Sequence, residues 1–296
     1  MQTLSEIRRL LEAHSLAPQK QYGQCFLVDL NLMHKLVELA DPPPGQTVLE
    51  VGAGTGSLSE ELLERGGRVV AVEIDRGLGD LLEERLGGRQ EFTLIRGDAM
   101  GSKHSLAPAV AAAVAPCAHL VSNLPYNIAT PLVAQCLVES WRSEAGRPGA
   151  ACRFERLTFT VQREVADRFA APPSTADYGP VSVLAALLGT LTPGPVVPAG
   201  AFWPRPTVAS RIVRIDFCAA GARRLADVEV LQRLLALAFG QRRKQIGSLL
   251  HRCQAQFEPA RMAQALEAGG IDRRVRAENV TPEQYLHAAN RLACLE

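Results

Sequence analysis

Short apolar runs alternate with longer segments of helical periodicity through the first two thirds of the chain. The runs are rich in Val, Ile, Leu and Thr, and most are bounded by Gly, Pro or Asp. We expect strands within residues 47–51, 68–75, 91–100, 118–123 and 156–162. We expect helices within residues 52–67, 77–88 and 129–140. Strands that alternate with helices predict βαβ units and a parallel sheet covered on both faces, which is a doubly wound, Rossmann-like α/β domain.

The pattern changes near residue 222, after which only helical periodicity remains. Residues 227–253, 260–270 and 281–296 are predicted to be helical, with Thr281 as an N-cap before Pro282. We therefore predict an α/β domain over residues 1–217 and a small all-helical domain over residues 218–296.

Composition fits a soluble, well-packed protein. Of 296 residues, 47% are hydrophobic and 21% are charged, and no apolar run reaches the ~18 residues that span a bilayer. The first 14 residues have an amphipathic helical pattern that includes acidic residues, unlike a secretory signal or a transit peptide. We expect a cytoplasmic monomer with no membrane partner.

The cysteines and histidines give no sign of a metal site. The seven cysteines are scattered without a C-x-x-C pair, and the six histidines form no H-E-x-x-H motif. Reduced thiols and no bound metal are the prediction.

A glycine-rich loop follows the first predicted strand. "EVGAGTGSL" supplies Gly52, Gly54 and Gly56, but Ser57 stands where the dinucleotide fingerprint G-x-G-x-x-G requires its third glycine. This weakens the case for a nicotinamide cofactor. The loop, with Glu50 before it, resembles the S-adenosylmethionine loop of class I methyltransferases, in which glycines let the backbone approach the cofactor.

Two acidic residues fall at the ends of the next strands. Glu73 could accept hydrogen bonds from both ribose hydroxyls of the cofactor, and Asp98 could accept one from the adenine amine. Either residue alone could simply end a strand or cap a helix. The glycine loop and both acids in this order favour a cofactor site.

The stretch "SNLPYNIATP" leaves the fourth predicted strand through an unusual turn. An adenine N6 amine is a weak nucleophile and must be held in line with a sulfonium methyl group. The Asn123 side chain and the Leu124 carbonyl offer acceptors for its protons, while Pro125 stiffens the turn and the ring of Tyr126 can stack on the base. Catalysis of this kind depends on positioning and electrostatics rather than on a strong base.

These motifs identify a resemblance that covers nearly the whole chain. The chain resembles the KsgA/RsmA family of ribosomal RNA adenine dimethyltransferases. The matching pieces are, in the family's order, "KQYGQCFLVD", "VLEVGAGTGSL", "VVAVEID", "GDAM", "SNLPYNIATPL", "VQREVADRFAAPPSTADYGPVSV", "VPAGAFWPRPTVASRIVRI" and "AFGQRRKQIGSLL". "NLPYNI" and "F.P.P.V.S" are the most specific, whereas many methyltransferases share the glycine loop.

The resemblance implies dimethylation of N6 on two adjacent adenosines in a hairpin near the 3′ end of small-subunit rRNA, as part of ribosome biogenesis. It implies S-adenosylmethionine as the cofactor. It assigns contacts with the cofactor or the reacting amine to Leu27, Gly52, Gly54, Glu73, Asp98 and Asn123. It also implies that Tyr126 and Phe202 sandwich the target base. Two positions depart from the family: Cys25 replaces an asparagine beside the cofactor's methionyl end, and Ala53 replaces a proline.

The mildly basic C-terminal part contains a candidate RNA contact. Residues 1–217 hold 20 Lys and Arg against 23 Asp and Glu, whereas residues 218–296 hold 12 against 8. Arg242, Arg243 and Lys244 end the first predicted helix of this part. They could be a solvated helix end or a phosphate contact, and the resemblance favours binding of RNA.

Two other functions stay open. The chain could be a related methyltransferase that acts on large-subunit rRNA, or on DNA or protein glutamine in the manner of enzymes with an N-P-P-Y motif. It could instead be an assembly or transcription factor that keeps the fold without turnover. Leu124 in place of proline and the C-terminal helices favour the small-subunit rRNA enzyme.

Overall fold

The chain divides into two units, each assembled from segments that are distant in the sequence. The computed structural model describes residues 1–102, 105–150 and 152–294. Unit 1 comprises Met1–Ser143, Pro148–Ala166 and Thr192–Phe217, and unit 2 comprises Glu144–Arg147, Asp167–Leu191 and Cys218–Glu296. Unit 2 therefore includes a segment, residues 167–191, that lies before the C-terminal helices in the sequence.

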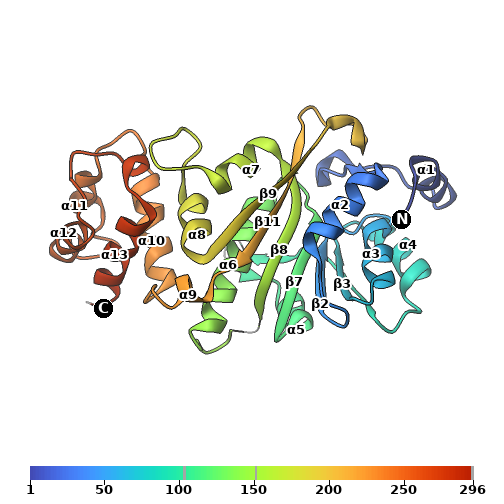
Figure 1. Ribbon diagram of the computed structural model, residues 1–296, viewed down its shortest axis with the longest axis horizontal. Helices are drawn as coiled ribbons and strands as arrows, with labels where there is room; N and C mark the ends of the chain where they lie inside the picture. Colours follow the sequence, from blue (N-terminus) through green and yellow to red (C-terminus); the bar gives the residue numbers. More distant parts are fainter. Residues whose placement is uncertain (103–104, 151, 295–296) are drawn as a thin grey trace. The chain divides into compact units, whose positions relative to one another are not determined.

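Unit 1 is built on a mixed sheet with the strand order β4-β3-β2-β7-β8-β11-β9 (Figure 1). The first five strands in this order pair in parallel, and β11 runs antiparallel to β8. The strands are β2 (Thr47–Val51), β3 (Arg68–Glu73), β4 (Phe92–Arg96), β7 (Cys117–Asn123), β8 (Arg153–Gln162), β9 (Gly189–Val197) and β11 (Ser210–Phe217).

The five strands expected from the sequence are confirmed, and within this sheet the sequence analysis missed β9 and β11. β9 contains Gly194 and Pro195 and has a single buried residue, Val197; it lies at the edge of the sheet, where a proline is tolerated but the apolar pattern is lost. In β11, Arg211, Arg214 and Asp216 interrupt the apolar residues at uneven spacing, so the sequence lacks the regular alternation typical of a strand.

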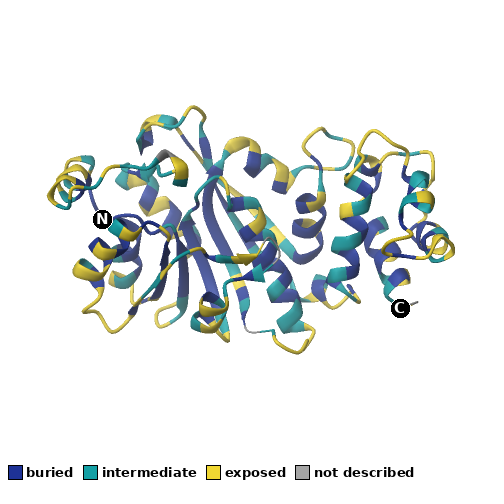
Figure 2. Ribbon diagram, turned by 180° about the vertical axis from the view of Figure 1, so that it is seen from behind, coloured by how far each residue is buried: buried dark blue, intermediate teal, exposed yellow. Residues whose placement is uncertain are grey.

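Helices cover both faces of this sheet: in the view of Figure 1, α2 lies in front of the strands and α6 behind them. The central strands are buried, and Val48 and Leu49 of β2 have no exposed surface (Figure 2). The helices of unit 1 are α1 (Leu4–Ala13), α2 (Leu30–Ala40), α3 (Ser57–Glu64), α4 (Arg76–Leu86), α5 (Pro108–Val114), α6 (Ala129–Glu144) and the start of α7 (Arg163–Ala170). The doubly wound α/β architecture is therefore confirmed.

Two short strand pairs flank the main sheet. β1 (Phe26–Leu27) pairs with β10 (Phe202–Trp203), so that Leu27 lies opposite Phe202. β5 (Met100–Ser102) pairs with β6 (Ser105–Leu106). The first pair brings two motifs together that are far apart in the sequence, "GQCFL" and "AFWPRP".

Unit 2 is helical. Its elements are α8 (Pro180–Leu188), α9 (Ala219–Ala222), α10 (Val228–Phe239), α11 (Leu249–Arg252), α12 (Pro259–Ala268), α13 (Pro282–Ala293) and short 3-10 turns at Ile246–Ser248 and Ala277–Asn279. As expected, Thr281 caps α13 before Pro282, accepting a hydrogen bond from the Gln284 backbone N–H. Within the described residues of the whole chain, no helix combines the length and apolar character needed to cross a bilayer.

Buried tyrosines explain why residues 167–191 belong to unit 2. Tyr178 donates a hydrogen bond to the Val280 carbonyl at 2.8 Å, and its ring packs against Phe239 of α10 at 6.0 Å between centroids. Tyr285 of α13 packs on the same Phe239 and donates to the Ala277 carbonyl at 2.9 Å. The segment before the C-terminal helices thus supplies part of their core.

The first C-terminal helix is shorter than the sequence analysis expected. α10 ends at Phe239, Gly240 is its C-cap, and residues 241–244 form a turn. Gly240 keeps right-handed helical dihedral angles, and its N–H still donates to the Ala236 carbonyl. Arg242, Arg243 and Lys244 therefore lie on a turn that follows the helix rather than in its last turn.

Candidate active site

The carboxyl ends of β2, β3 and β7 open onto one pocket. In the strand order, β2 lies between β3 and β7, and doubly wound sheets bind ligands at such a point, where the strand order reverses. Every cofactor residue predicted from the sequence lines this pocket, namely Cys25, Leu27, Gly52, Gly54, Glu73, Asp98 and Asn123. Leu124, Pro125 and Tyr126 line it as well.

The glycine loop fits so closely that side chains would collide. Gly52 and Gly54 have φ angles of 76° and 62°. A Cβ atom would come within 2.9 Å of Pro125 Cγ at Gly52 and within 2.9 Å of the Phe26 ring at Gly54. Both positions therefore require glycine, for backbone conformation and for space.

Glu73 ties the glycine loop to the end of β3. Its side chain is only 4% exposed, and its two oxygens accept hydrogen bonds from the backbone N–H groups of Gly54 at 2.8 Å and Asp75 at 3.0 Å. Burial raises the pKa of Glu73, and these hydrogen bonds partly oppose that effect. The carboxylate keeps lone pairs that could accept further hydrogen bonds from a ligand.

A second buried carboxyl group lies under the same loop. Glu50, at 2% exposure, accepts a hydrogen bond of 2.5 Å from the Ser59 hydroxyl. Burial and, to a smaller extent, the charge of nearby Glu73 raise the pKa of Glu50 to about 8, against the lowering effect of the Ser59 hydrogen bond. Near neutral pH, Glu50 is therefore largely protonated.

Asp98 stands at the open side of the pocket. It is exposed, and its Oδ1 atom accepts a hydrogen bond of 2.9 Å from the Met100 backbone N–H. Ile74 directly follows Glu73 in the sequence. Its side chain lines the pocket and is 45% exposed. The pocket thus offers an accessible carboxylate and an apolar face.

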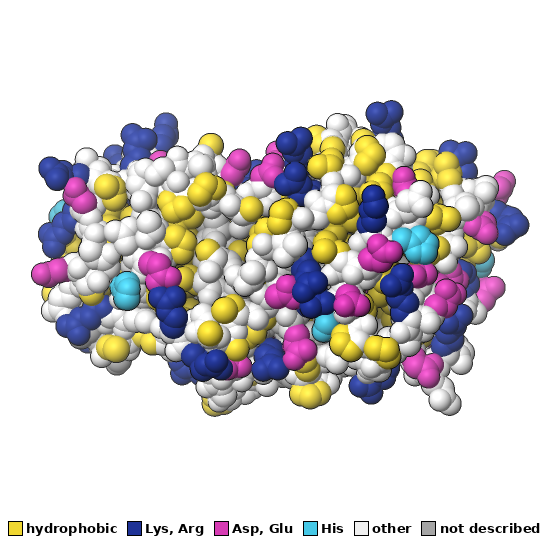
Figure 3. Space-filling view, in the orientation of Figure 1, with side chains coloured by type: hydrophobic (Ala, Val, Ile, Leu, Met, Phe, Trp, Pro, Cys, Tyr) yellow, Lys and Arg dark blue, Asp and Glu magenta, His cyan; other side chains and the backbone are white. Residues whose placement is uncertain are grey.

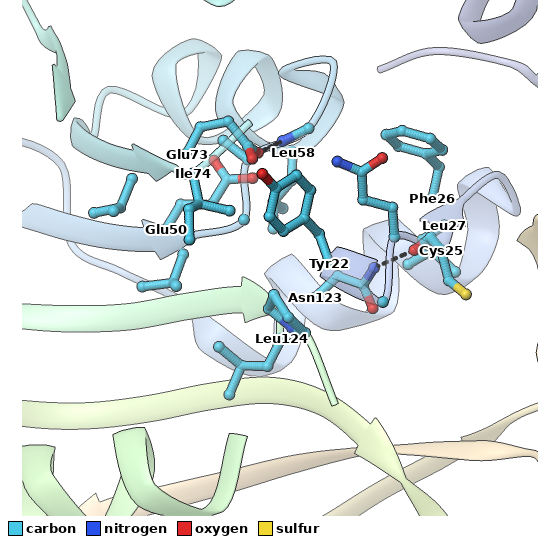
Figure 4. Close-up of a pocket in the computed structure, with 18 of the residues that line it drawn as sticks. Tyr22, Cys25, Phe26, Leu27, Glu50, Leu58, Glu73, Ile74, Asn123 and Leu124 are labelled. Carbon is cyan, nitrogen blue, oxygen red and sulfur yellow. Dashed lines mark hydrogen bonds between the residues drawn. The ribbon is translucent and has the colours of Figure 1, made fainter. Parts of the chain in front are cut away.

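The Asn123 amide is held in one orientation (Figure 4). Its Nδ2 group donates a hydrogen bond of 2.9 Å to the Cys25 carbonyl. Its Oδ1 atom is buried, and within the described part of the chain it has no hydrogen-bond partner. A buried acceptor without a partner is costly, so this oxygen is a ready site for an N–H donor of a ligand.

The rest of the NLPY turn is fixed by neighbouring strands. The Leu124 backbone N–H donates to the Thr160 carbonyl at 3.2 Å, and the Tyr126 hydroxyl lies 2.9 Å from the Ser210 hydroxyl. Burial raises the pKa of Tyr126. The ring of Tyr126 is therefore held at the pocket by a residue of β11.

Phe202 lies outside the pocket lining. Its side chain is 3% exposed and belongs to a buried apolar cluster that also contains Leu27 and Met33. Of the five residues predicted to handle the target adenine, the structure thus brings four together, and Phe202 is adjacent only through the backbone pairing of β10 with β1.

The Cys25 thiol is half-buried, and burial raises its pKa. A thiol with a raised pKa is a weak nucleophile at neutral pH. Among the described residues, no group of three or more His, Cys, Asp or Glu side chains could hold a metal ion.

The predicted RNA contacts lie in unit 2, by a hollow of basic side chains. On the face shown in Figure 3, Lys and Arg side chains are interspersed with acidic ones, so a basic surface has to be sought locally. We define the basic hollow by its lining residues, which are Arg243, Lys244, Gln245, Gly247, Ser248, His251, Arg273, Arg274 and Arg276.

Two segments form the basic hollow because their backbones pair. The Ile246 N–H donates to the Val275 carbonyl at 2.7 Å, and the Gly247 N–H donates to the Arg273 carbonyl at 2.8 Å. Arg242 is not part of the lining and donates to the Ala176 carbonyl at 3.0 Å. Sequence reasoning missed Arg273, Arg274 and Arg276, although "DRRVR" repeats the basic character of "QRRK".

Other residues that hold the pocket were missed because their roles depend on distant partners. Gln2 exchanges hydrogen bonds with Thr55, and its backbone N–H donates to Ser57, so it supports the glycine loop from outside. Ser210 was visible as the last residue of "F.P.P.V.S", but its bond to Tyr126 was not. Asp75 follows Glu73 by two positions, and the sequence around it indicates only a helix cap.

Comparison with known proteins agrees with this geometry. The family model described as "Ribosomal RNA adenine dimethylase" matches residues 16–294. The chain belongs to this family. A ribosomal RNA small subunit methyltransferase A from Phenylobacterium zucineum (strain HLK1) is 40% identical over 292 residues, which is 98% of this chain and 93% of that protein.

Two solved structures share the fold of this chain. A dimethyladenosine transferase from Plasmodium falciparum is similar with a TM-score of 0.65 at 20% identity, covering 87% of this chain and 94% of that one. The 23S rRNA methyltransferase ErmE is similar with a TM-score of 0.58 at 26% identity, covering 90% of this chain and 99% of that one. The predictions of the family, the fold class and an rRNA adenine dimethyltransferase are therefore confirmed.

Glu50 makes stability depend on pH. Its pKa in the folded chain lies near 8, above the ordinary value of 4.5, so the folded state keeps a proton that the unfolded state loses. This contribution is fully present below about pH 4.5 and is lost as the pH rises through about 8. In chemical denaturation, we expect the free energy of unfolding to fall less from about pH 6 to about pH 9 in Glu50→Gln than in the wild type.

The matched control is Glu64→Gln, which removes an exposed carboxylate from the same region and should leave the pH dependence as it is. Equal pH dependence in the wild type and in Glu50→Gln would contradict the assignment of a protonated Glu50.

Proposed function

We propose that this chain uses S-adenosylmethionine to dimethylate N6 of two adjacent adenosines in a hairpin near the 3′ end of small-subunit rRNA. The observation that carries the proposal is the Asn123 amide. Its Nδ2 group is bound to the Cys25 carbonyl, which leaves a buried Oδ1 acceptor without a partner in the described structure. That acceptor can take a hydrogen bond from an N6 amine and hold its lone pair toward the methyl donor.

The residues of the pocket fit S-adenosylmethionine, which supplies a sulfonium methyl group when bound. Gly52 and Gly54 line the pocket without side chains, so a ligand can approach their backbone. Glu73 would accept hydrogen bonds from the ribose hydroxyls, and Asp98 would accept one from the adenine amine. The partly exposed side chain of Ile74 would pack against the adenine ring. No side chain has to act as a strong base, because positioning and electrostatics carry the reaction.

Relatives support the small subunit as the source of the substrate. The relative at 40% identity is named a small-subunit rRNA methyltransferase, whereas ErmE, a 23S rRNA methyltransferase, is similar at 26%. The higher identity favours small-subunit rRNA. We further propose that the enzyme is a cytoplasmic monomer and meets its hairpin on a small-subunit ribosomal particle during biogenesis.

The basic hollow is the proposed phosphate contact. Arg243 and Lys244 share it with Arg273, Arg274 and Arg276, although Arg274 is paired with Asp272. Lys and Arg at phosphates supply affinity without base specificity, so this surface positions the RNA and leaves selection to the pocket. Unit 2 as an RNA-binding domain remains a prediction, as does the role of Arg242.

The decisive experiment separates cofactor binding from transfer. Glu73→Ala should weaken binding of S-adenosylmethionine, measured by calorimetry, by about tenfold or more, because buried carboxylate hydrogen bonds are lost. Asn123→Ala should abolish methylation of small-subunit particles while both ligands still bind. Primer extension across the rRNA locates the methylated adenosines.

Large-subunit rRNA serves as the matched control substrate. Modification of 23S rRNA instead of small-subunit rRNA would overturn the substrate assignment, and unchanged cofactor affinity in Glu73→Ala would overturn the ribose assignment.

The roles of Tyr126 and Phe202 can be separated by removing rings while keeping apolar volume. Stacking contributes ~1–3 kcal/mol per base, so Tyr126→Leu should slow single-turnover methyl transfer about tenfold with nearly unchanged cofactor affinity. Phe202→Leu should slow it similarly if both rings hold the base. An unchanged rate in Phe202→Leu, with Tyr126→Leu slow, would show that Phe202 only packs in the apolar cluster.

Neutralising the basic hollow should weaken RNA binding in a salt-dependent way. We expect Arg243→Gln with Arg273→Gln to lower affinity for small-subunit rRNA and to reduce the slope of log affinity against log salt by about one per lost phosphate contact. Arg291→Gln, an exposed change on α13 outside the basic hollow, is the control. Equal slopes for the double variant and the control would contradict the phosphate contact.

A further inference from the structure

The segment over residues 19–25 forms one wall of the pocket. Tyr22, Gly23, Gln24 and Cys25 line the pocket, and in the view of Figure 4 the Tyr22 ring lies between the side chains of Glu73 and Asn123. A wall made by a loop has to be held in place by its contacts, because a 3-10 turn of three residues is the only regular structure that the described chain shows there.

Two glutamines fasten this segment to Asp75. Gln19 Nε2 donates to Asp75 Oδ2 at 2.8 Å, and Gln24 Nε2 donates to the same oxygen at 3.1 Å. The Gln19 backbone N–H also donates to Gln24 Oε1 at 2.7 Å, which closes the segment on itself. Hydrogen bonds join this segment to the rest of unit 1 at both of its ends: the two glutamines donate to Asp75 Oδ2, and the Cys25 carbonyl accepts from Asn123.

Asp75 divides its two oxygens between two tasks. Oδ1 caps α4 by accepting from the backbone N–H groups of Gly77 at 2.9 Å and Leu78 at 3.2 Å. Oδ2 accepts only from the two glutamines among the described groups. The residue is 5% exposed, and such a buried carboxylate is stable because four donors surround it.

Asp75 is also bonded to the predicted ribose acid. Its backbone N–H donates to Glu73 Oε1 at 3.0 Å, while Glu73 Oε2 accepts from Gly54. A continuous set of hydrogen bonds therefore runs from the pocket wall at Gln24, through Asp75 and Glu73, to the glycine loop.

We propose that Asp75 is a positioning residue that holds residues 19–25 closed over the cofactor, through the hydrogen bonds that its Oδ2 atom accepts from Gln19 and Gln24. The inference rests on the proposed function, since it assigns the pocket to S-adenosylmethionine. Helix capping by Oδ1 and wall closure by Oδ2 are separate, so the two can be tested apart.

Asp75→Asn is the discriminating variant. Asparagine caps a helix about as well as aspartate, so Oδ1 keeps its task, but an NH₂ group then faces the two donating glutamine amides. We expect binding of S-adenosylmethionine to weaken about tenfold in calorimetry, with a raised KM and a smaller change in kcat. Hydrogen exchange of residues 19–25 in the ligand-free protein should become faster, and the melting temperature should change little.

Adding Gln24→Glu to Asp75→Asn should restore the closed wall. The introduced carboxylate at position 24 can accept from the introduced amide at position 75, which reverses the direction of the original bond. Gln24→Glu alone places two carboxylates together and should weaken cofactor binding. We expect the double variant to bind better than either single variant and to recover slow exchange in residues 19–25.

Gln19→Met provides a second test that leaves the cap and the pocket lining intact. It removes one donor to Asp75 and keeps a similar side-chain shape, so exchange of residues 19–25 should quicken and cofactor binding should weaken. Unchanged exchange and affinity in Asp75→Asn and Gln19→Met, or simple addition of the two losses in the Asp75→Asn, Gln24→Glu double variant, would overturn the inference. A wild-type protein that bound no S-adenosylmethionine would instead overturn the proposed function, and the exchange measurement would still report on the wall.

Discussion

The hydrogen bond from the Gly54 backbone N–H to the Glu73 carboxylate joins the glycine loop to β3 at the end of the sheet that opens onto the pocket. A buried carboxylate costs several kcal/mol unless it is hydrogen-bonded, and the N–H groups of Gly54 and Asp75 meet that requirement. Because one donor belongs to the glycine loop and the other to the start of α4, the loop and β3 are fixed relative to each other before any ligand arrives. Glu50 beneath them is largely protonated near neutral pH, so the charge of Glu73 is not opposed by a second buried anion.

Much of this site was predictable because chain direction and strand order limit where side chains can meet. Parallel strands end at one edge of a sheet, so the acids after the second and third predicted strands and Asn123 after the fourth had to converge. Gly52, Glu73, Asp98 and Asn123 line the pocket for this reason, whereas Cys25 and Leu27, which also line it, were predicted from the family resemblance. The glycines were equally readable, because positive φ and close approach at Gly52 and Gly54 leave few other choices.

The contacts that could not be predicted join residues that are distant in the sequence. Each of these residues also has a local role that explains its presence without the distant contact. Asp75 reads as a helix cap, which it is, yet its other oxygen holds two glutamines more than fifty residues away in sequence. Ser210 lies on β11, which the sequence analysis did not predict because arginine and aspartate residues interrupt its apolar pattern. The hydrogen bond between Ser210 and Tyr126 could therefore not be predicted. Gly240 gave a local signal for the end of α10, but the apolar periodicity that continues beyond it outweighed that signal.

Phe202 belongs to a motif that predicts contact with the target base, but its side chain packs in the apolar core instead. Only Tyr126 is already in place at the pocket, while Phe202 is 3% exposed in the cluster with Leu27. Exposing a buried phenylalanine costs ~1.5–3 kcal/mol, which is close to the ~1–3 kcal/mol that stacking on a base returns. A two-ring clamp built from these residues would therefore be nearly balanced, and Phe202 would leave the cluster only when a base is there to receive it. Because β10 pairs with β1, which carries Leu27 at the pocket wall, that movement would act on the same strand pair that bounds the pocket.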